Sequence, residues 1–274
     1  MTAALVEAGK IGAFVRRDLL IAWSYRLAFF TDVVSMAAQA FVFSIIGQLV
    51  DPARLPEYGG SQTTYMEFVA IGLVLTLVIT LLLERVATAL RQEQVIGTLE
   101  SLLTTPTRTA TVQIGSAAFE FLWVPVRAAL FLLAIAVGFG LDFHAGGILP
   151  AAVLVLAFVP FVWGLGLVSA ATILTFRRGA SGATAIATLL GLASGAFFPV
   201  ELLPGWLSWI TAGNPIAITL DGVREALLGG TGWTDVGPAV VLLVPLSAVA
   251  LAIGVAAFRV ALRRERRLGT LGLY

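Results

Sequence analysis

The sequence contains no cysteine and only one histidine, His144, among its 274 residues. These shortages exclude disulfides, thiol catalysis and any site built on a cluster of cysteines or histidines. The phosphate-binding pattern GxxxxGK[ST] is also missing, as are the HExxH zinc pattern and the GxSxG nucleophile pattern. The sequence therefore has none of these common signs of an enzyme or a nucleotide-binding protein, and we expect no cofactor in this chain.

Charged residues are scarce as well, at 12% of the chain, whereas soluble domains carry about a quarter. Hydrophobic residues make up 59%, and the mean hydropathy is +0.97. We therefore predict an all-α integral membrane protein, because a helix needs about 20 mostly apolar residues to cross a bilayer. Six transmembrane helices are predicted, over 28–50, 64–83, 112–139, 150–176, 181–198 and 236–258. They form a transmembrane domain over 28–260, which a basic tail over 261–274 follows.

Residues 1–27 are predicted to form an amphipathic helix that lies on the membrane surface. Apolar residues collect on one face, and Lys10, Arg16, Arg17 and Arg26 supply basic charge for anionic headgroups. No small-residue cleavage site follows a short apolar core. We therefore interpret this segment as retained cytoplasmic sequence and not as a signal peptide.

The basic residues outside the predicted spans are distributed very unevenly. Only Arg54 and Arg224 fall on the side opposite the termini, and all the others fall on the side of the termini. Cytoplasmic loops carry the excess of lysine and arginine in multi-pass membrane proteins. The chain is therefore predicted to be a multi-pass protein of the cytoplasmic membrane, with both termini in the cytoplasm.

Several polar residues fall inside predicted spans, where such groups need a partner or a cavity. Asp32 and Gln39 belong to a polar stripe on the first span, which either packs against other helices or contacts substrate. Glu120 and Arg127 lie seven residues apart on one face of the third span. Arg127 is the deeper of the two. The sequence leaves open whether it pairs with an acidic residue on another helix or contacts a polar headgroup.

The polar interval 91–108 separates the second span from the third. Val95, Leu99 and Leu102 recur at i, i+4 and i+7, which predicts a short amphipathic helix that ends at Thr105-Pro106. A short charged helix between two membrane helices is well shaped to dock onto a protein outside the membrane. The alternative is a cytoplasmic loop that happens to be helical.

Residues 199–230 do not have the pattern of a plain loop. Prolines interrupt the apolar and aromatic stretch from Pro199 to Trp209, and Asn214-Pro215 begins a second short helical pattern that ends at Leu228. Each piece is too short to cross a bilayer. We therefore expect re-entrant or interfacial helices at the outer surface.

Four motifs, in order along the chain, resemble those of the ABC type-2 permeases, the membrane subunits of one class of ATP-binding-cassette exporters. They are Ser24-Tyr25-Arg26, Gly97-Thr98-Leu99-Glu100 with Thr105-Pro106, Phe197-Phe198-Pro199 with Leu203-Pro204 and Trp206, and Asn214-Pro215 with Asp221-Gly222-Val223-Arg224-Glu225. The resemblance covers essentially the whole chain, and the second and third motifs together are its most specific part.

The resemblance implies a working unit of two permeases, expected to be a homodimer, and two copies of a separate ATPase that binds ATP and Mg²⁺. It identifies residues 1–27 with the elbow helix of the family, 91–108 with the coupling helix and 199–230 with outer re-entrant helices. The site residues that it implies are Gln94, Thr98, Leu99 and Glu100 for contact with the ATPase, and Phe197, Phe198 and Pro199 for the outer gate. The first and fifth spans are expected at the interface between permeases.

The predicted function is ATP-driven export of a hydrophobic or amphipathic substrate, such as a drug, a lipid or a lipid-linked glycan. The substrate class rests on the mostly apolar spans, and the sequence does not identify the molecule. One alternative is a secondary transporter or channel driven by an ion gradient, which Asp32, Glu120 and Arg127 would serve. A membrane scaffold without transport activity is the other.

Overall fold

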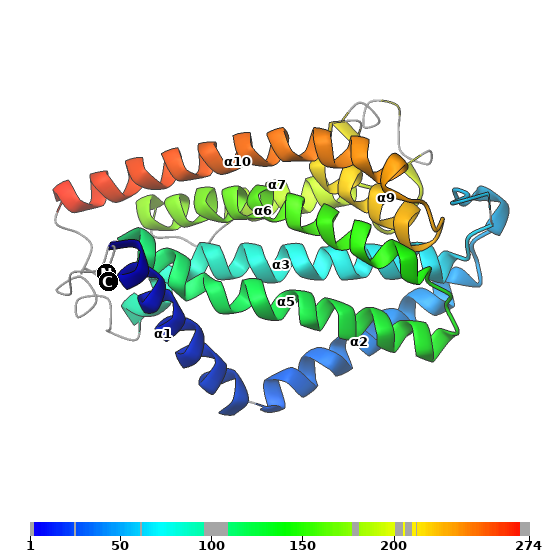
Figure 1. The fold of residues 1–274 in the computed structure, drawn as a ribbon, viewed down its shortest axis with the longest axis horizontal. Helices are drawn as coiled ribbons and strands as arrows, with labels where there is room; N and C mark the ends of the chain where they lie inside the picture. The colour runs from blue at the N-terminus through cyan, green and yellow to red at the C-terminus, as the bar shows by residue number, and fades with distance from the viewer. Residues whose placement is uncertain are drawn as a thin grey trace.

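The computed structural model describes residues 3–24, 26–60, 62–95, 109–176, 181–200, 205, 210–211 and 213–268. This part of the chain is helical, as predicted. Its helices are α1 (Ala3–Ser24), α2 (Arg26–Gly47), α3 (Tyr65–Val95), α5 (Thr109–Phe139), α6 (Ile148–Phe176), α7 (Ser181–Leu192), α9 (Pro215–Leu227) and α10 (Trp233–Leu268), with 3-10 turns η1 (Pro52–Arg54) and η2 (Ala145–Gly147). In Figure 1, α3, α5, α6 and α10 run alongside one another as a bundle.

The two ends of this bundle differ in the elements that they carry (Figure 1). At one end α3 stops at Val95, α5 begins at Thr109, and α10 ends in a segment with Arg263, Arg264 and Arg267. We call this the charged end. The other end carries α9 and the starts of α6 and α10, and we call it the α9 end.

Four of the described helices contain apolar stretches long enough to cross a membrane. These stretches are Tyr65–Thr88, Ala118–Phe139, Ala145–Phe176 and Trp233–Glu265, which correspond to the predicted second, third, fourth and sixth spans. The apolar stretch of α2 is shorter and covers Val33–Gly47. Crossing of the membrane by the first and fifth predicted spans therefore stays a prediction.

The helix predicted over 181–198 is shorter in the structure, where α7 ends at Leu192. Gly195 has a φ of +77°, in the left-handed region that glycine adopts most readily, and residues 193–198 form turns and bends. At 12 residues, α7 is shorter than the roughly 17–25 residues of a helix that crosses a bilayer.

Local sequence determines where two of the helices begin. The amide of Thr64 donates to the carboxylate of Glu67 over 2.8 Å, and the amide of Glu67 donates back to the Thr64 hydroxyl over 3.3 Å. This reciprocal capping box starts α3. Asn214 caps α9 by accepting from the Ile216 amide at 3.0 Å, and Pro215 occupies the first helical position.

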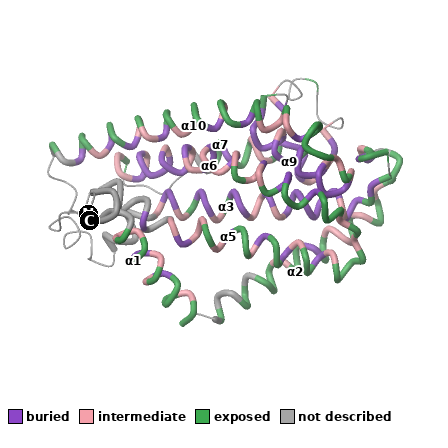
Figure 2. Tube along the Cα trace, in the orientation of Figure 1, coloured by how far each residue is buried: buried purple, intermediate pink, exposed green. Residues whose placement is uncertain are grey.

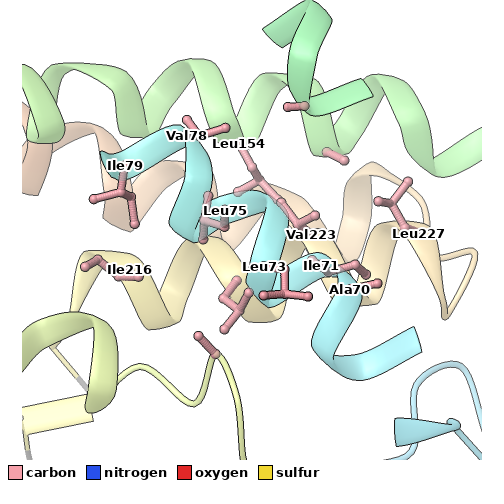
Figure 3. Packing of buried hydrophobic residues seen from close by; sticks show 14 of the residues in the cluster. Ala70, Ile71, Leu73, Leu75, Val78, Ile79, Leu154, Ile216, Val223 and Leu227 are labelled. Atoms are coloured by element: carbon pink, nitrogen blue, oxygen red, sulfur yellow. The ribbon is translucent and has the colours of Figure 1, made fainter. Parts of the chain in front are cut away.

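Helix α3 is the most enclosed of the long helices, because 67% of its apolar stretch is buried, against 17% for α10. Figure 2 shows the buried residues concentrated along α3, α6 and α9. Ile71 and Leu75 of α3 lie in one cluster with Leu154 of α6 and Val223 of α9 (Figure 3). The core therefore lies where these three helices meet.

Close backbone contacts join α6 to its neighbours. A β-carbon at Gly254 of α10 would collide with the carbonyl of Gly164 on α6, and one at Gly164 would collide with the carbonyl of Ala250. Gly166 similarly brings α6 within van der Waals distance of Val86 on α3. Helices approach this closely only where small residues remove the side chain between them.

Helices α1 and α2 form a V beside the bundle (Figure 1). Most large apolar residues of α2 are exposed, among them Val34, Phe41 and Ile45, and Ala40 is fully buried. Helix α2 therefore packs against α3 and α5 along one narrow face.

We expect Gly254→Ala to destabilise the protein by about 1–3 kcal/mol, because the added methyl group overpacks the contact with Gly164. Gly237→Ala on the same helix is the matched control, since a β-carbon there would meet no atom within 4 Å. The measurement is the thermal unfolding midpoint in detergent. Equal midpoints for the two variants would show that the contact between α6 and α10 does not need a glycine.

Candidate functional site

The turn at residues 193–198 lies directly against α3 near the α9 end. Gly72 permits this approach, because a β-carbon there would collide with the carbonyl of Ala196. Where a chain leaves a helix, its last carbonyl groups lose their amide partners and need other donors. Side chains supply donors to six carbonyls here. Three of these bonds join Asn214 to the Leu190 carbonyl at 2.7 Å, Ser194 to Gly191 at 2.6 Å, and Thr211 to Ala193 at 2.9 Å.

Arg224 of α9 donates to the next two carbonyls of the turn. Its Nη2 atom lies 3.0 Å from the Gly195 oxygen and 3.2 Å from the Ala196 oxygen. The same atom donates to the Phe68 carbonyl of α3 at 3.0 Å, and the guanidinium carbon lies 3.5 Å from the centroid of the Phe68 ring. One side chain therefore joins α9, α3 and the turn.

The burial of Arg224 adds to the sequence analysis, which counted this residue with Arg54 on the side opposite the termini. The residue is 1% exposed and is among the largest fully buried side chains in the described part of the chain. A buried charge is tolerated only when it is paired and hydrogen-bonded. The three carbonyls and the ring meet that requirement, together with Asp221 at 3.8 Å.

Tyr58, in the loop before α3, is also buried, and the charge of Arg224 acts on its phenol group. Burial raises the pKa of Tyr58 to about 12, and the positive charge of Arg224 acts in the opposite direction. Burial likewise lowers the pKa of Arg224, while Tyr58 and Asp221 raise it. An arginine remains protonated in proteins, so the cluster combines a positive guanidinium with a neutral phenol.

The predicted gate residues lie at the end of this turn. The Tyr65 hydroxyl of α3 donates to the Phe197 carbonyl at 3.0 Å, which is the sixth of the carbonyls with a side-chain donor. The Phe197 ring stacks on Phe43 of α2, with centroids 5.4 Å apart and planes 7° apart. Phe198 is half-buried and Pro199 is buried. Phe197 is therefore the predicted gate residue that contacts both α2 and α3.

A cavity of about 480 Å³ lies between α2, α3 and α5. Its lining is mostly apolar, with Met36 and Ala40 from α2, Leu77 and Leu81 from α3, and Phe131 from α5. The polar side chains in the lining are Ser35, Gln39 and Arg127. The volume is in the range of pockets that bind drug-sized molecules, about 300–1,000 Å³.

The structure places two of the predicted intramembrane residues at this cavity. Gln39 and Arg127 both line this cavity, from facing helices. Glu120 is half-buried on α5 and is not part of the lining. Asp32 belongs to α2, but its side chain lies outside the described residues.

The predicted coupling residues fall almost entirely outside the described part of the chain. Gln94 belongs to the last turn of α3, and its side chain is not described. Thr98, Leu99 and Glu100 lie outside the described residues.

An ion pair joins α1 to α3 toward the charged end. The carboxylate of Asp18 lies 2.7 Å from Arg85 of α3 and 2.8 Å from Arg17 beside it, and Asp18 is 5% exposed. Nearby, Phe14 of α1 packs on Gly115 of α5, where a β-carbon would contact the ring. Helix α1 is therefore attached to both helices that flank the 91–108 interval.

Among the described residues, no three histidine or acidic side chains gather closely enough to hold a metal ion. Comparison with family models gives a match to the ABC-2 type transporter over residues 10–228. The chain belongs to the ABC-2 type transporter family. No curated protein matches it.

Membership of the ABC-2 family makes the chain a multi-pass membrane protein and the permease component of an ABC exporter. Such membrane domains generally lack a nucleotide-binding site and usually work with an ATPase subunit. The match ends at residue 228, directly after α9, so α10 lies beyond it.

Sequence reasoning included Arg224 in the fourth motif without giving it a role, and it did not single out Tyr65 or Phe43. Arg224 sits between Val223 and Glu225 and follows Asp221, which gives it the sequence context of a surface residue. The available signal was its helical spacing from Leu220 and Leu227, which places it on the apolar face of α9.

We expect Arg224→Lys to destabilise this ABC-2 permease, because lysine lacks the Nε donor that also bonds the Phe68 carbonyl and the planar group that lies on the Phe68 ring. Each buried carbonyl left without its donor costs about 1–3 kcal/mol. The exposed Arg263→Lys is the matched control. Thermal unfolding in detergent measures both, and an unchanged midpoint for Arg224→Lys would contradict the assignment.

Proposed function

We propose that this protein is the permease subunit of an ATP-driven exporter that moves a hydrophobic or amphipathic substrate out across the cytoplasmic membrane. Two copies of the chain, as a homodimer, would work with two copies of a separate ATPase that binds ATP and Mg²⁺. The observation that carries the proposal is the continuity of α3 and α5. Each is one helix from the 91–108 interval to the cavity, and both line that cavity.

The lengths of α3 and α5 support transmission of force between these two places. Helix α3 continues from the end of its apolar stretch at Thr88 to Val95, and α5 begins at Thr109, before its apolar stretch starts at Ala118. The charged connection between them is therefore tethered outside both apolar stretches. A push on residues 91–108 by a closing ATPase pair would displace α3 and α5 and change the cavity between them.

The proposed membrane arrangement has six crossings, with both termini, residues 91–108 and the charged end in the cytoplasm. Residues 28–260 form the transmembrane domain, and 261–274 the tail. The segment 199–230, which contains α9, would be the re-entrant part at the outer surface. Within the elbow helix of residues 1–27, Leu20 and Trp23 are 59% and 71% exposed, which suits contact with lipid at the interface.

The lining of the cavity suits an amphipathic substrate better than a fully polar one, because most of it is apolar. Its apolar walls suit a hydrocarbon or aromatic portion, while Gln39 and Arg127 offer hydrogen-bond donors to a polar or anionic head. We therefore propose that these two residues contact the substrate head.

The exporter assignment is tested by purifying the tagged permease after expression with the proteins encoded beside it. We expect an ATPase with a P-loop to co-purify. Glu100→Arg, in the proposed coupling helix, should weaken that association about tenfold, equivalent to about 1.4 kcal/mol.

The matched control is Glu57→Arg, because Glu57 is an exposed carboxylate in the loop before α3, far along the chain from residues 91–108. If Glu57→Arg weakens the association as much, residues 91–108 are not the docking site. If no P-loop protein co-purifies with the wild-type chain, the gradient-driven transporter replaces the exporter as the function to test.

The substrate contact is tested with lysophosphatidylglycerol, a single-chain anionic amphiphile, as an activator of ATP hydrolysis by the purified complex. We expect Arg127→Leu to raise the half-maximal concentration about tenfold or more, because a hydrogen bond to a charged group contributes about 1.5–3 kcal/mol. Arg127→Lys keeps the charge and should retain most of the response. An unchanged response in a folded Arg127→Leu protein would remove Arg127 from the substrate path.

A further inference from the structure

The turn at residues 193–198 is held by hydrogen bonds to α3 and α9, whereas its contact with α2 is a ring stack. Side chains from α9, α3 and the segment between α7 and α9 hold it, through Arg224, Tyr65 and Thr211. Its described contact with α2 is the stack of Phe43 on Phe197. That stack has no hydrogen bond or ion pair within it, so it can separate without leaving a buried polar group exposed to lipid.

The face of α2 that makes this contact also covers the cavity. Met36, Ala40, Phe43 and Gly47 recur at i, i+4, i+7 and i+11, which places them along one stripe of the helix. Met36 and Ala40 line the cavity, whereas Phe43 stacks on Phe197 and Gly47 lies against the Tyr65 ring. One face of α2 therefore closes the cavity along the first half of the helix. Along the second half, the same face meets Phe197 of the turn and Tyr65 of α3.

The surroundings of α2 indicate that it is the part able to move. Within one copy of the chain, large apolar residues of α2 that do not line the cavity, such as Val34 and Ile45, are exposed, and the cavity separates part of the inner face of α2 from α5. By contrast, glycine contacts join α6 closely to both α10 and α3. Within that copy, a displacement of α2 breaks few contacts, whereas a displacement of the turn breaks the bonds of Arg224.

We propose that α2 is the moving side of the outer gate, and that the gate opens where Phe43 separates from Phe197. Arg224 and Tyr65 are positioning residues that keep the turn in place while α2 moves. A substrate head in the cavity presses on the same face of α2, so occupation of the cavity favours separation at Phe43. This inference rests on the proposed exporter function and adds which element moves and where the gate parts.

The absence of cysteine makes a direct test possible, because two introduced cysteines are the only sites for a spin label in each copy of this chain, which is labelled before the ATPase is added. The test pair is Ile45→Cys on α2 with Val241→Cys on α10, and the control pair is Leu149→Cys on α6 with Val241→Cys. All three positions are exposed. Pulsed electron spin resonance gives the distance in each pair for the permease–ATPase complex, without nucleotide and with ATP and vanadate.

We expect the test distance to shift by more than the width of its nucleotide-free distribution, and the control distance to stay the same. An unchanged test distance would overturn the inference, as would an equal shift in both pairs. The presence of the ATPase in the purified complex is scored separately. Its absence would count against the exporter itself, whereas a bound, active ATPase with an immobile α2 would count against this inference alone.

A second measurement tests the contact itself. In Phe43→Cys with Phe197→Cys, without spin labels, a short bis-methanethiosulfonate reagent should link α2 to the turn and abolish the stimulation of ATP hydrolysis by lysophosphatidylglycerol, and a reductant should restore it. Each single cysteine variant, treated in the same way, should keep the stimulation. If the linked protein is still stimulated, the gate does not open between Phe43 and Phe197.

Discussion

Carbonyl groups that leave a helix inside an apolar protein must find hydrogen-bond donors, and the turn after α7 depends on that constraint. Six carbonyls between Leu190 and Phe197 receive donors from side chains, and all of those donors except Ser194 come from other parts of the sequence. Arg224 contributes most, because its fork also reaches α3. The unpaired carbonyls of the turn and the buried guanidinium would each be costly alone. Together they are stabilised, because the guanidinium donates hydrogen bonds to the carbonyls.

This arrangement divides the molecule into parts held by different physical means. Helices α6 and α10 are joined by close backbone contact at glycines, and the turn is joined to α3 and α9 by hydrogen bonds to carbonyls. Helix α1 is attached through the buried carboxylate of Asp18. Helix α2 has mainly apolar packing along one face, which is non-directional and tolerates sliding. A transporter needs both kinds of attachment, since it must hold its shape while one wall moves.

Hydropathy was sufficient to predict the helical class, the four long spans and the short helix that begins at Asn214-Pro215, because each signal is local in the sequence. The early end of α7 was not predicted, since Ala193 to Phe198 is apolar and reads as a continuation of the span. The cavity shared by Gln39 and Arg127 depends on how α2 packs against α5, and periodicity within one helix carries no information on its partner. The burial of Arg224 was not predicted for a similar reason: its partners are backbone carbonyls, which have no sequence signature.

The partners of Arg224 have one feature in common that bears on how the chain is made. Phe68, Gly195 and Ala196 all precede Arg224 in the sequence, and so does Tyr58. During synthesis, every group that stabilises the buried guanidinium therefore leaves the ribosome before the guanidinium itself. The buried guanidinium therefore meets a prepared site, and α10 is synthesised after it.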